Sequence, residues 1–467
     1  MTSVREQLAL AKGYRAEGLS SFRDAGASEN KTLPMHRWVP WIAGFSAQFV
    51  QDVIEEYLPS GPRGECLILD PFAGVGTTLI EGLKAGSNVL GFEINAYAAL
   101  AASAKLEALD LSPTMIREQT QAFVERIRVS EERIDRVWLE AGEPGLKELM
   151  AVAGPRVQQT YKSRIPFFSP PVELKVMSAL HAMTSLTPGI QPLVKVALGA
   201  TMVAVSNYSY EPSLSSRPGA GKPLVENGSL TQPLAQKLFE IVEDLEWAQA
   251  ALPMSAWKRR RDVVLGSYFD SSLPQGSVSL VITSPPYMNN YHYVRNTRPQ
   301  LHWLGLLTDT AQLKQYETGN FGKFWQTVRQ GPPVELVPPH DQLRVALDRL
   351  RDLRVEKGSY GGSGWANYVA SYFNDCWRLV NLLEYQLAHG GTAVIVVGNS
   401  IIQGIEFKVD EVLADLAEAA GLTTEAISIV RTKRVGNSII GSSVRNDNGE
   451  AQGGRLYDAA VILRKNS

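Results

Sequence analysis

The chain has 467 residues, of which 44% are hydrophobic and 20% are charged. This composition is typical of a globular protein, large enough for one domain with insertions or for two to three domains, and it excludes disordered, fibrous and small disulfide-stapled proteins. Lys and Arg number 46 against 48 Asp and Glu, so any nucleic-acid surface must come from local clustering of charge.

The cysteine content and the N-terminus exclude further classes. The two cysteines, Cys66 and Cys376, form neither a disulfide framework nor a closely spaced metal-ligand set, so we expect no bound metal. The N-terminal residues contain no continuous apolar segment, and the chain has no apolar run long enough to span a membrane. We therefore expect a cytoplasmic protein without a membrane partner.

Residues 64–94 show the strongest local α/β pattern. The apolar run from Cys66 to Leu69 predicts a strand, which is followed by the glycine-rich DPFAGVGTT, an amphipathic stretch and a second strand that ends at Glu93. Glycines at 74 and 76 let backbone N–H groups approach a ligand, although a plain tight turn would use the same residues. The loop lacks the Gly-Lys-Ser/Thr of a phosphate-binding loop, and Leu79 departs from the dinucleotide pattern. A nucleoside with a zwitterionic tail fits best, with Glu93 at its ribose.

The rest of the chain alternates between helical and α/β patterns. Residues 111–262 show long helical periodicity and end in the basic run of Lys258, Arg259, Arg260 and Arg261, a candidate phosphate contact. A strand at 278–282 stops at two prolines, and residues 305–365 form a polar segment punctuated by Gly and Pro. Beyond it we expect a helix near 366–388, a terminating turn at 390–391, a strand at 392–397, a helix near 408–420 and strands near 424–432 and 457–464.

The motif Thr-Ser-Pro-Pro-Tyr, residues 283–287, follows the strand at 278–282. Ligands of open α/β sheets bind at the carboxyl ends of strands, so this loop is a candidate site. The prolines stiffen the turn, Ser284 and a proline carbonyl can point at one amino group, and Tyr287 can stack on a planar base. A proline turn with a packed tyrosine is the alternative interpretation.

Together these motifs resemble a known family. DPFAGVGTT, the following GFEIN and the distant TSPPY are similar to motifs of the S-adenosylmethionine-dependent DNA amino-methyltransferases, which modify N4 of cytosine or N6 of adenine. HRWVPWIAGFSAQFV, residues 36–50, resembles the family's N-terminal cofactor-covering segment. YMNNYHYVRNTRPQLHWLG, from Tyr287, is similar to the sequence after SPP in N4-cytosine enzymes. The resemblance covers a little over half of the chain.

The resemblance implies a site and a cofactor. The implied cofactor is S-adenosyl-L-methionine, held by residues of the glycine loop and the next strand, namely Asp70, Phe72, Ala73, Gly74, Gly76, Thr77 and Glu93. The implied catalytic loop consists of Ser284, Pro285, Pro286 and Tyr287. Ser rather than Asp or Asn at 284 favours cytosine. The family's usual Gly-Asp pair is Gly266-Ser267 here, which puts a role for Ser267 or Asp270 in doubt.

The resemblance also implies a fold and a function. We expect an α/β fold, the Rossmann-like doubly wound sheet of class I methyltransferases, built from 30–110, 263–304 and 366–467, with a helical insertion at 111–262 and a smaller, loop-rich insertion at 305–365. Both insertions are candidate DNA-contacting regions. The expected function is N4-cytosine methylation of double-stranded DNA at specific sites, in partnership with a cognate restriction endonuclease. The alternatives are adenine-N6 methylation, methylation of RNA amines, and a non-catalytic DNA-binding subunit of a defence complex.

Overall fold

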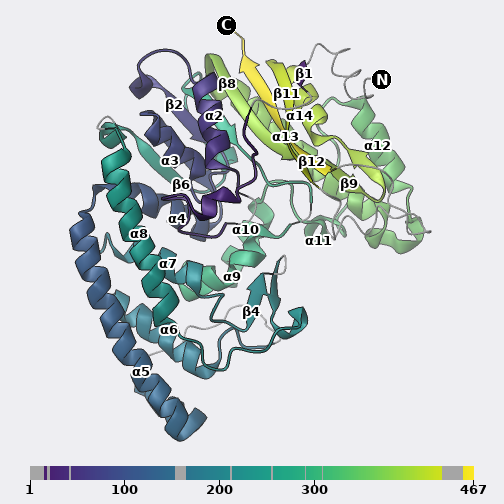
Figure 1. The fold of residues 1–467 in the computed structure, drawn as a ribbon. Helices are drawn as coiled ribbons and strands as arrows, with labels where there is room; N and C mark the ends of the chain where they lie inside the picture. The colour runs from purple at the N-terminus through teal and green to yellow at the C-terminus, as the bar shows by residue number, and fades with distance from the viewer. Residues whose placement is uncertain are drawn as a thin grey trace.

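The computed structural model describes residues 15–17, 22–41, 44–152, 165–210, 213–253, 256–289, 291–307, 309–433 and 456–466. Its centre is an eight-stranded sheet in the order β1-β11-β12-β8-β7-β2-β3-β6 (Figure 1). The strands are β1 (Arg15–Glu17), β2 (Leu67–Asp70), β3 (Asn88–Glu93), β6 (Arg261–Leu265), β7 (Val278–Thr283), β8 (Leu387–Gly398), β11 (Leu422–Lys433) and β12 (Leu456–Lys465).

The sheet is mostly parallel, with one reversed strand. The five strands from β6 to β8 pair in parallel, whereas β12 is antiparallel to both β8 and β11. Parallel neighbours need crossover connections, and helices supply them on both faces of the sheet. This is the predicted Rossmann-like, doubly wound methyltransferase architecture, and the prediction is confirmed.

Successive side chains of each central strand enter two separate cores. Ile68 and Leu280 belong to one hydrophobic cluster, whereas their neighbours Leu69 and Val281 belong to the other. A strand buried on both faces reads as a continuous apolar run, which explains why these strands were recognisable from sequence. The first core is covered by α2 (Ala47–Tyr57), α3 (Thr77–Lys84) and α4 (Ala96–Glu107), and the second by α12 (Asp341–Arg351), α13 (Gly362–Gln386) and α14 (Val409–Ala419).

The helical segment extends below the sheet in Figure 1. It contains α5 (Pro113–Val152), α6 (Pro170–Met183), α7 (Gln191–Thr201) and α8 (Thr231–Ala251), with a small hairpin of β4 (Tyr208–Tyr210) and β5 (Leu214–Ser216). The long α5 is broken at Gly142, where φ is 56° and ψ is −145°. Buried residues of α6, α7 and α8 belong to the same cluster as those of α2 to α4, so this segment shares a core with the sheet.

Shorter elements complete the chain. They are α9 (Tyr293–Trp303), α10 (Thr310–Gly319), α11 (Trp325–Val328), the pair β9 (Ser400–Ile402) and β10 (Ile405–Phe407), and the 3-10 turns Glu29–Lys31, Arg63–Glu65, Ala108–Asp110, Pro218–Ala220, Ala256–Lys258, Tyr268–Asp270 and Val355–Tyr360. The described part of 305–365 therefore contains α10, α11, α12 and the start of α13, and Leu343, Leu347 and Leu350 of α12 are buried in the second core.

One turn lies elsewhere than predicted. Gly390 and Gly391 do not end the helix, because α13 already ends at Gln386 and β8 begins at Leu387. Gly390 has a φ of +71° inside β8, close to a register irregularity opposite Val278 to Leu280. A glycine at positive φ within a strand is typical of a β-bulge. Gly390 and Gly391 therefore lie in an irregular first part of β8 and not in a turn after α13.

Candidate active site

The glycine loop connects β2 to α3 at the carboxyl edge of the sheet. Gly74 has a φ of +52° and Gly76, which precedes the first residue of α3, has a φ of +86°. A Cβ on Gly74 would lie 3.2 Å from Nε1 of Trp41, and one on Gly76 would lie 3.2 Å from Cβ of Ala102 in α4. Both positions therefore need glycine, for backbone conformation and for close approach.

Asp70 links the glycine loop to the catalytic loop. Its carboxylate is fully buried and accepts hydrogen bonds from the Phe72 N–H at 3.0 Å, Thr78 Oγ1 at 2.7 Å and Thr283 Oγ1 at 2.6 Å. Burial raises its pKa to about 6, and the three hydrogen bonds act in the opposite direction. Thr283 directly precedes Ser284, so Asp70 joins the ends of β2 and β7 instead of lining the pocket itself.

Glu93, at the end of β3, faces the same edge. Its Oε1 accepts from the Asn95 N–H at 2.7 Å and its Oε2 from the Gly74 N–H at 2.8 Å. Burial raises the pKa of Glu93 to about 7, although both backbone donors lower it. Each carboxylate oxygen keeps a second lone pair that a ligand hydroxyl could use.

The predicted catalytic loop leaves β7 beside β8. The Ser284 hydroxyl donates to the Val396 carbonyl at 3.1 Å, which fixes its orientation, and the Ser400 hydroxyl donates to the Met288 carbonyl at 2.7 Å, which holds the far end of the loop. Tyr287 is half-buried, and a Cβ on Gly398 would lie 3.2 Å from its ring. Burial, with the nearby Asp458, raises the pKa of Tyr287 well above its ordinary value.

The two loops meet at one pocket, which we call the cofactor-side pocket. Of the residues predicted from sequence, it is lined by Phe72, Gly74, Glu93, Ser284 and Pro286. The remaining predicted residues do not line it; these are Asp70, Ala73, Gly76, Thr77, Pro285 and Tyr287. Ala73 donates its N–H to the Phe92 carbonyl at 2.9 Å, so it supports the loop from below.

Sequence reasoning missed several residues that line this pocket. Phe321 contacts Phe72 edge to face, with ring centroids 5.2 Å apart, and stacks on Phe269 at 6.1 Å. Together these rings form an aromatic wall. Ser267 also lines the pocket, whereas Asp270 does not, and the Ser267 hydroxyl accepts from the Phe269 N–H at 3.2 Å. In the sequence, Phe321 is an aromatic residue in a short turn between Gly319 and Gly322, within an otherwise polar segment, and this position could have indicated its role.

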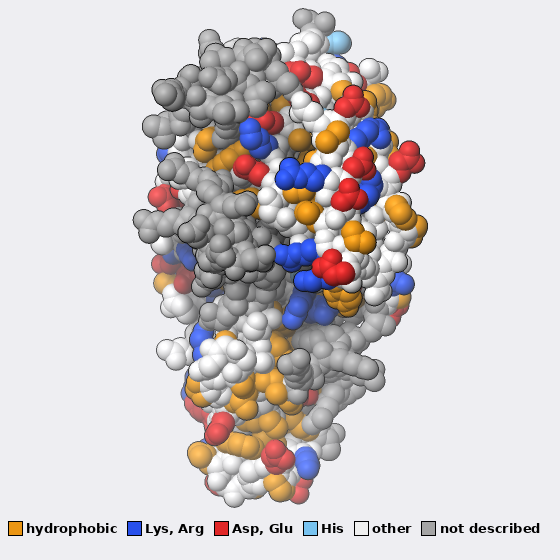
Figure 2. All heavy atoms as spheres, turned by 90° about the vertical axis from the view of Figure 1, so that its right-hand side faces the viewer, with side chains coloured by type: hydrophobic (Ala, Val, Ile, Leu, Met, Phe, Trp, Pro, Cys, Tyr) orange, Lys and Arg blue, Asp and Glu red, His pale blue; other side chains and the backbone are white. Residues whose placement is uncertain are grey.

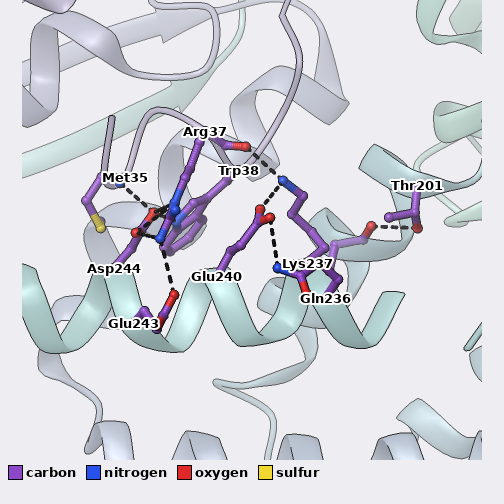
Figure 3. Close-up of polar contacts among 10 residues, drawn as sticks. Met35, Arg37, Trp38, Thr201, Gln236, Lys237, Glu240, Glu243 and Asp244 are labelled. Atoms are coloured by element: carbon purple, nitrogen blue, oxygen red, sulfur yellow. Dashed lines mark hydrogen bonds and ion pairs between the residues drawn. The ribbon is translucent and has the colours of Figure 1, made fainter. Parts of the chain in front are cut away.

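Residues 35–41 bring Trp41 to the pocket and are anchored on α8 (Figure 3). The buried carboxylate of Asp244 accepts hydrogen bonds from the Met35 N–H at 2.7 Å, from Trp38 Nε1 at 2.9 Å and from Arg37 Nη2 at 2.7 Å. Lys237, two turns earlier on α8, donates to the Arg37 carbonyl at 3.0 Å. The segment that resembles a cofactor cover is thus held by the helical segment, which the sequence did not suggest.

The basic run lies at the start of the edge strand β6. Lys258 and Arg260 are exposed, but Arg260 pairs with Asp262 at 2.6 Å and Arg261 pairs with Asp110. The Arg259 guanidinium packs against Gly64, where a Cβ would lie 1.8 Å from Nη1. Of these four cations, Arg260 and Arg261 are therefore already paired with carboxylates, and a role for the run in DNA binding stays a prediction.

Neither a candidate metal cluster nor a membrane-spanning helix occurs among the described residues. Within them no group of three or more His, Cys, Asp or Glu side chains is placed to hold a metal ion. None of the helices in the same residues has the length and apolar character needed to cross a membrane.

Comparison with known proteins extends the motif resemblance to most of the chain. No protein-family model matches. The Type II methyltransferase M.BsoBI of Geobacillus stearothermophilus is 24% identical over 439 residues, which cover 88% of this chain and 82% of that protein. The Type II methyltransferase M.AvaI of Nostoc sp. is 22% identical over the same share of this chain and 83% of its own. M.MjaII of Methanocaldococcus jannaschii is 30% identical over 88 residues, 19% of this chain and 16% of its own. The chain is therefore similar to Type II methyltransferases over most of its length, and together with the Rossmann-like sheet and both motif loops at one pocket this supports the resemblance to the DNA amino-methyltransferase family.

Proposed function

We propose that this protein transfers a methyl group from S-adenosylmethionine to the N4 amine of a cytosine in double-stranded DNA. The observation that supports it best is that Ser284 of the predicted catalytic loop, Gly74 of the glycine loop and Glu93 at the end of β3 line one pocket. A methyl donor and an amine acceptor must meet within van der Waals distance, and this arrangement allows it. A serine at 284 favours cytosine over adenine.

The pocket fits S-adenosylmethionine. The aromatic wall of Phe72, Phe269 and Phe321 suits an adenine ring, and Glu93 can accept hydrogen bonds from ribose hydroxyls. Gly74, which has no side chain, lines the pocket beside Trp41 where the methionine end would lie. When bound, the cofactor supplies an electrophilic methyl group on a sulfonium.

The catalytic loop suits the activation of an aromatic amine. The lone pair of such an amine is delocalised into the ring, so hydrogen bonds from its N–H groups to fixed acceptors favour pyramidalisation and aim the nitrogen. In this proposal Ser284 Oγ, which donates to the Val396 carbonyl and is also hydrogen-bonded to Tyr287, accepts from the amine together with a proline carbonyl. The base must leave the duplex to reach this loop, at a cost of a few kcal/mol, and Tyr287 would stack on it. The displaced amine proton goes to solvent, and neither cysteine needs to act as a nucleophile.

The relatives named Type II methyltransferases support site-specific DNA methylation, paired with a cognate endonuclease. One face of the molecule is suited to DNA. Figure 2 shows Lys and Arg side chains gathered near its middle, where the molecule narrows towards the helical segment. We propose that 111–262 and 305–365 contact DNA around this region. Lys258, Arg259, Arg260 and Arg261 lie at the start of β6, at the opposite edge of the sheet from β1, and we propose them as separate phosphate contacts.

Product analysis tests the proposed function. The purified protein is incubated with methyl-labelled S-adenosylmethionine and unmethylated duplex DNA, the DNA is digested to nucleosides, and the labelled nucleoside is identified by mass spectrometry. We expect N4-methylcytosine. N6-methyladenine would overturn the base assignment, and label found only in RNA, or no transfer despite cofactor binding, would overturn the DNA methyltransferase proposal.

Glu93 predicts a pH dependence of cofactor binding. Its pKa is raised to about 7, so the carboxyl becomes neutral, and a weaker acceptor for ribose hydroxyls, as the pH falls through that value. If only the ionised form binds well, the dissociation constant of S-adenosylmethionine should rise about tenfold between pH 8 and pH 6. Calorimetry at several pH values measures this change. Glu93→Gln should bind weakly at every pH, and an equal slope in that variant would contradict the assignment.

A further inference from the structure

The cofactor-side pocket receives part of its wall from residues 319–323, which we call the 320-turn. Gly319, Asn320 and Phe321 line the pocket. The turn begins at the last residue of α10 and lies within 305–365, the segment expected from sequence to be an insertion that contacts DNA. This segment therefore also contributes side chains to the place proposed for the cofactor.

The backbone of the 320-turn is strained. Gly322 has a φ of +75° and Lys323 has a φ of +49°. The left-handed conformation costs free energy for a residue with a Cβ, so Lys323 keeps it only because its surroundings hold it. Glycine is required at 322, since a Cβ there would lie 2.5 Å from Cδ2 of Tyr372 in α13. Strain of this kind at a ligand pocket points to a turn that positions a side chain.

Asp375 of α13 holds the 320-turn. The Gly322 N–H donates to Asp375 Oδ2 at 2.8 Å, and Asp375 is 7% exposed. Lys323 Nζ lies 3.9 Å from the same oxygen. It also donates to the carbonyls of Thr318 at 2.7 Å and Asn320 at 3.0 Å, which closes the turn onto its own start. One buried carboxylate thus contacts both left-handed residues.

Two side-chain amides line the pocket in the described part of the chain, and one of them is already used. Asn95 donates from Nδ2 to Thr297 Oγ1 at 2.7 Å, and its Oδ1 accepts from the Tyr97 N–H at 3.1 Å. Asn320 is 5% exposed, and its Nδ2 has no hydrogen-bond partner among the described residues. A buried donor without a partner costs free energy, so a ligand that satisfies the Asn320 amide gains affinity.

The Asn320 amide lies next to the aromatic wall in sequence and in the pocket. It directly precedes Phe321, whose ring forms the wall with Phe72 and Phe269. A planar base that stacks on this wall presents its edge to neighbouring polar groups. The edge of adenine carries an amine donor beside a ring-nitrogen acceptor, and an asparagine amide offers the complementary acceptor and donor. Either orientation of the amide offers the same two groups.

We propose that Asn320 recognises the adenine of S-adenosylmethionine, and that Asp375 is the positioning residue that holds the 320-turn for this contact. This inference rests on the proposed function and adds to it the residue that distinguishes the base of the cofactor. Glu93 at the ribose and Ser284 at the amine keep the roles proposed above.

Binding of two demethylated cofactors tests the role of Asn320 without any methyl transfer. The probes are S-adenosylhomocysteine and its 6-deamino analogue, in which unsubstituted purine replaces adenine, and calorimetry measures both dissociation constants. The wild type should bind the analogue about 10-fold more weakly, because the purine has no amine to donate to the amide oxygen of Asn320. Asn320→Ala should bind S-adenosylhomocysteine more weakly than the wild type and should bind the two probes equally.

Asn381 on α13 provides the matched control. Its exposed side chain donates to the Trp377 carbonyl at 2.7 Å, so Asn381→Ala removes the same kind of amide outside the pocket. That variant should keep the wild-type ratio of the two dissociation constants. If Asn320→Ala weakens the binding of both probes by the same factor, Asn320 does not contact the base, and the proposal is overturned.

Asp375→Ala tests the positioning role. We expect the dissociation constant of S-adenosylhomocysteine to rise about 10-fold, and the ratio between the two probes to fall towards one, because the Gly322 N–H loses its acceptor and releases the turn. Asp375→Asn keeps an oxygen that can accept from this N–H, and it should restore the ratio. A wild-type ratio in Asp375→Ala, or no recovery in Asp375→Asn, would show that Asp375 does not position Asn320.

The outcomes separate this inference from the proposed function. A wild type that binds both probes with equal affinity would overturn the inference alone. A wild type that binds neither probe would overturn the proposed cofactor as well. Methyl transfer to DNA is measured independently by the product analysis.

Discussion

Ser284→Ala should lower kcat by about 100-fold to 1,000-fold while leaving the affinity for S-adenosylmethionine nearly unchanged. The Ser284 hydroxyl lines the cofactor-side pocket and donates to the Val396 carbonyl at 3.1 Å, so its orientation is set before substrate arrives. Alanine removes an acceptor needed chiefly when the amine becomes pyramidal. Single-turnover methylation measures the chemical step, and calorimetry measures cofactor binding.

A second serine, Ser277, directly precedes the strand β7 that Ser284 follows, and it provides the control. The Ser277 hydroxyl donates to the Pro274 carbonyl at 2.7 Å, at the exposed start of β7, so Ser277→Ala removes the same kind of hydrogen bond far from the pocket. We expect that variant to methylate at the wild-type rate. An equal loss of activity in both variants, or full activity of Ser284→Ala, would contradict a catalytic role for Ser284.

Asp244→Ala should lower the free energy of unfolding by about 3–5 kcal/mol, because it leaves buried donors without their acceptor. Asp244 is 1% exposed and receives hydrogen bonds from the Met35 N–H and from Trp38 Nε1, besides its ion pair with Arg37. The same change should weaken S-adenosylmethionine binding, since the segment that it releases carries Trp41. Urea unfolding and calorimetry give the two values.

The neighbouring residue on α8 separates an anchoring effect from a general charge effect. Glu243 lies 3.5 Å from Arg37 Nη2, and its side chain is 45% exposed. Surface ion pairs contribute about 0–1 kcal/mol, so Glu243→Ala should change the free energy of unfolding by no more than that. Similar losses in the Asp244 and Glu243 variants would show that Asp244 does not anchor the segment.

Features that depend on a few consecutive residues could be predicted from the sequence. The strands at 67–70 and 278–283 bury both faces and read as apolar runs, and the residues after them form the glycine loop and the Ser-Pro-Pro loop. Because parallel strands end at the same edge, the meeting of the two loops at one pocket followed from the fold class. Glu93 reached the pocket for the same reason.

Features that depend on distant partners could not be predicted. The motif places Asp70 among the residues expected to line the pocket. In the structure, its carboxylate instead accepts hydrogen bonds from the Thr78 and Thr283 hydroxyls. Thr283 is 213 residues away along the chain, so no local sequence pattern reveals this partner. Asp244 looks like an ordinary acidic residue of an exposed helix until Met35 and Trp38 are placed against it. Phe321 likewise enters the pocket only through tertiary packing.

If residues 111–262 read the DNA sequence, as we propose, the core that this helical segment shares with the sheet limits how the protein could change its recognition sequence. The α7 helix accepts a hydrogen bond from Tyr97 of α4 through Val196, and α8 holds residues 35–38 through Asp244. A chimaera that received residues 111–262 from a relative would lose both attachments unless the matching sides of α4 and the N-terminal segment were transferred too. New specificity should therefore arise by substitutions at exposed positions, one at a time, and not by exchange of the segment as a cassette.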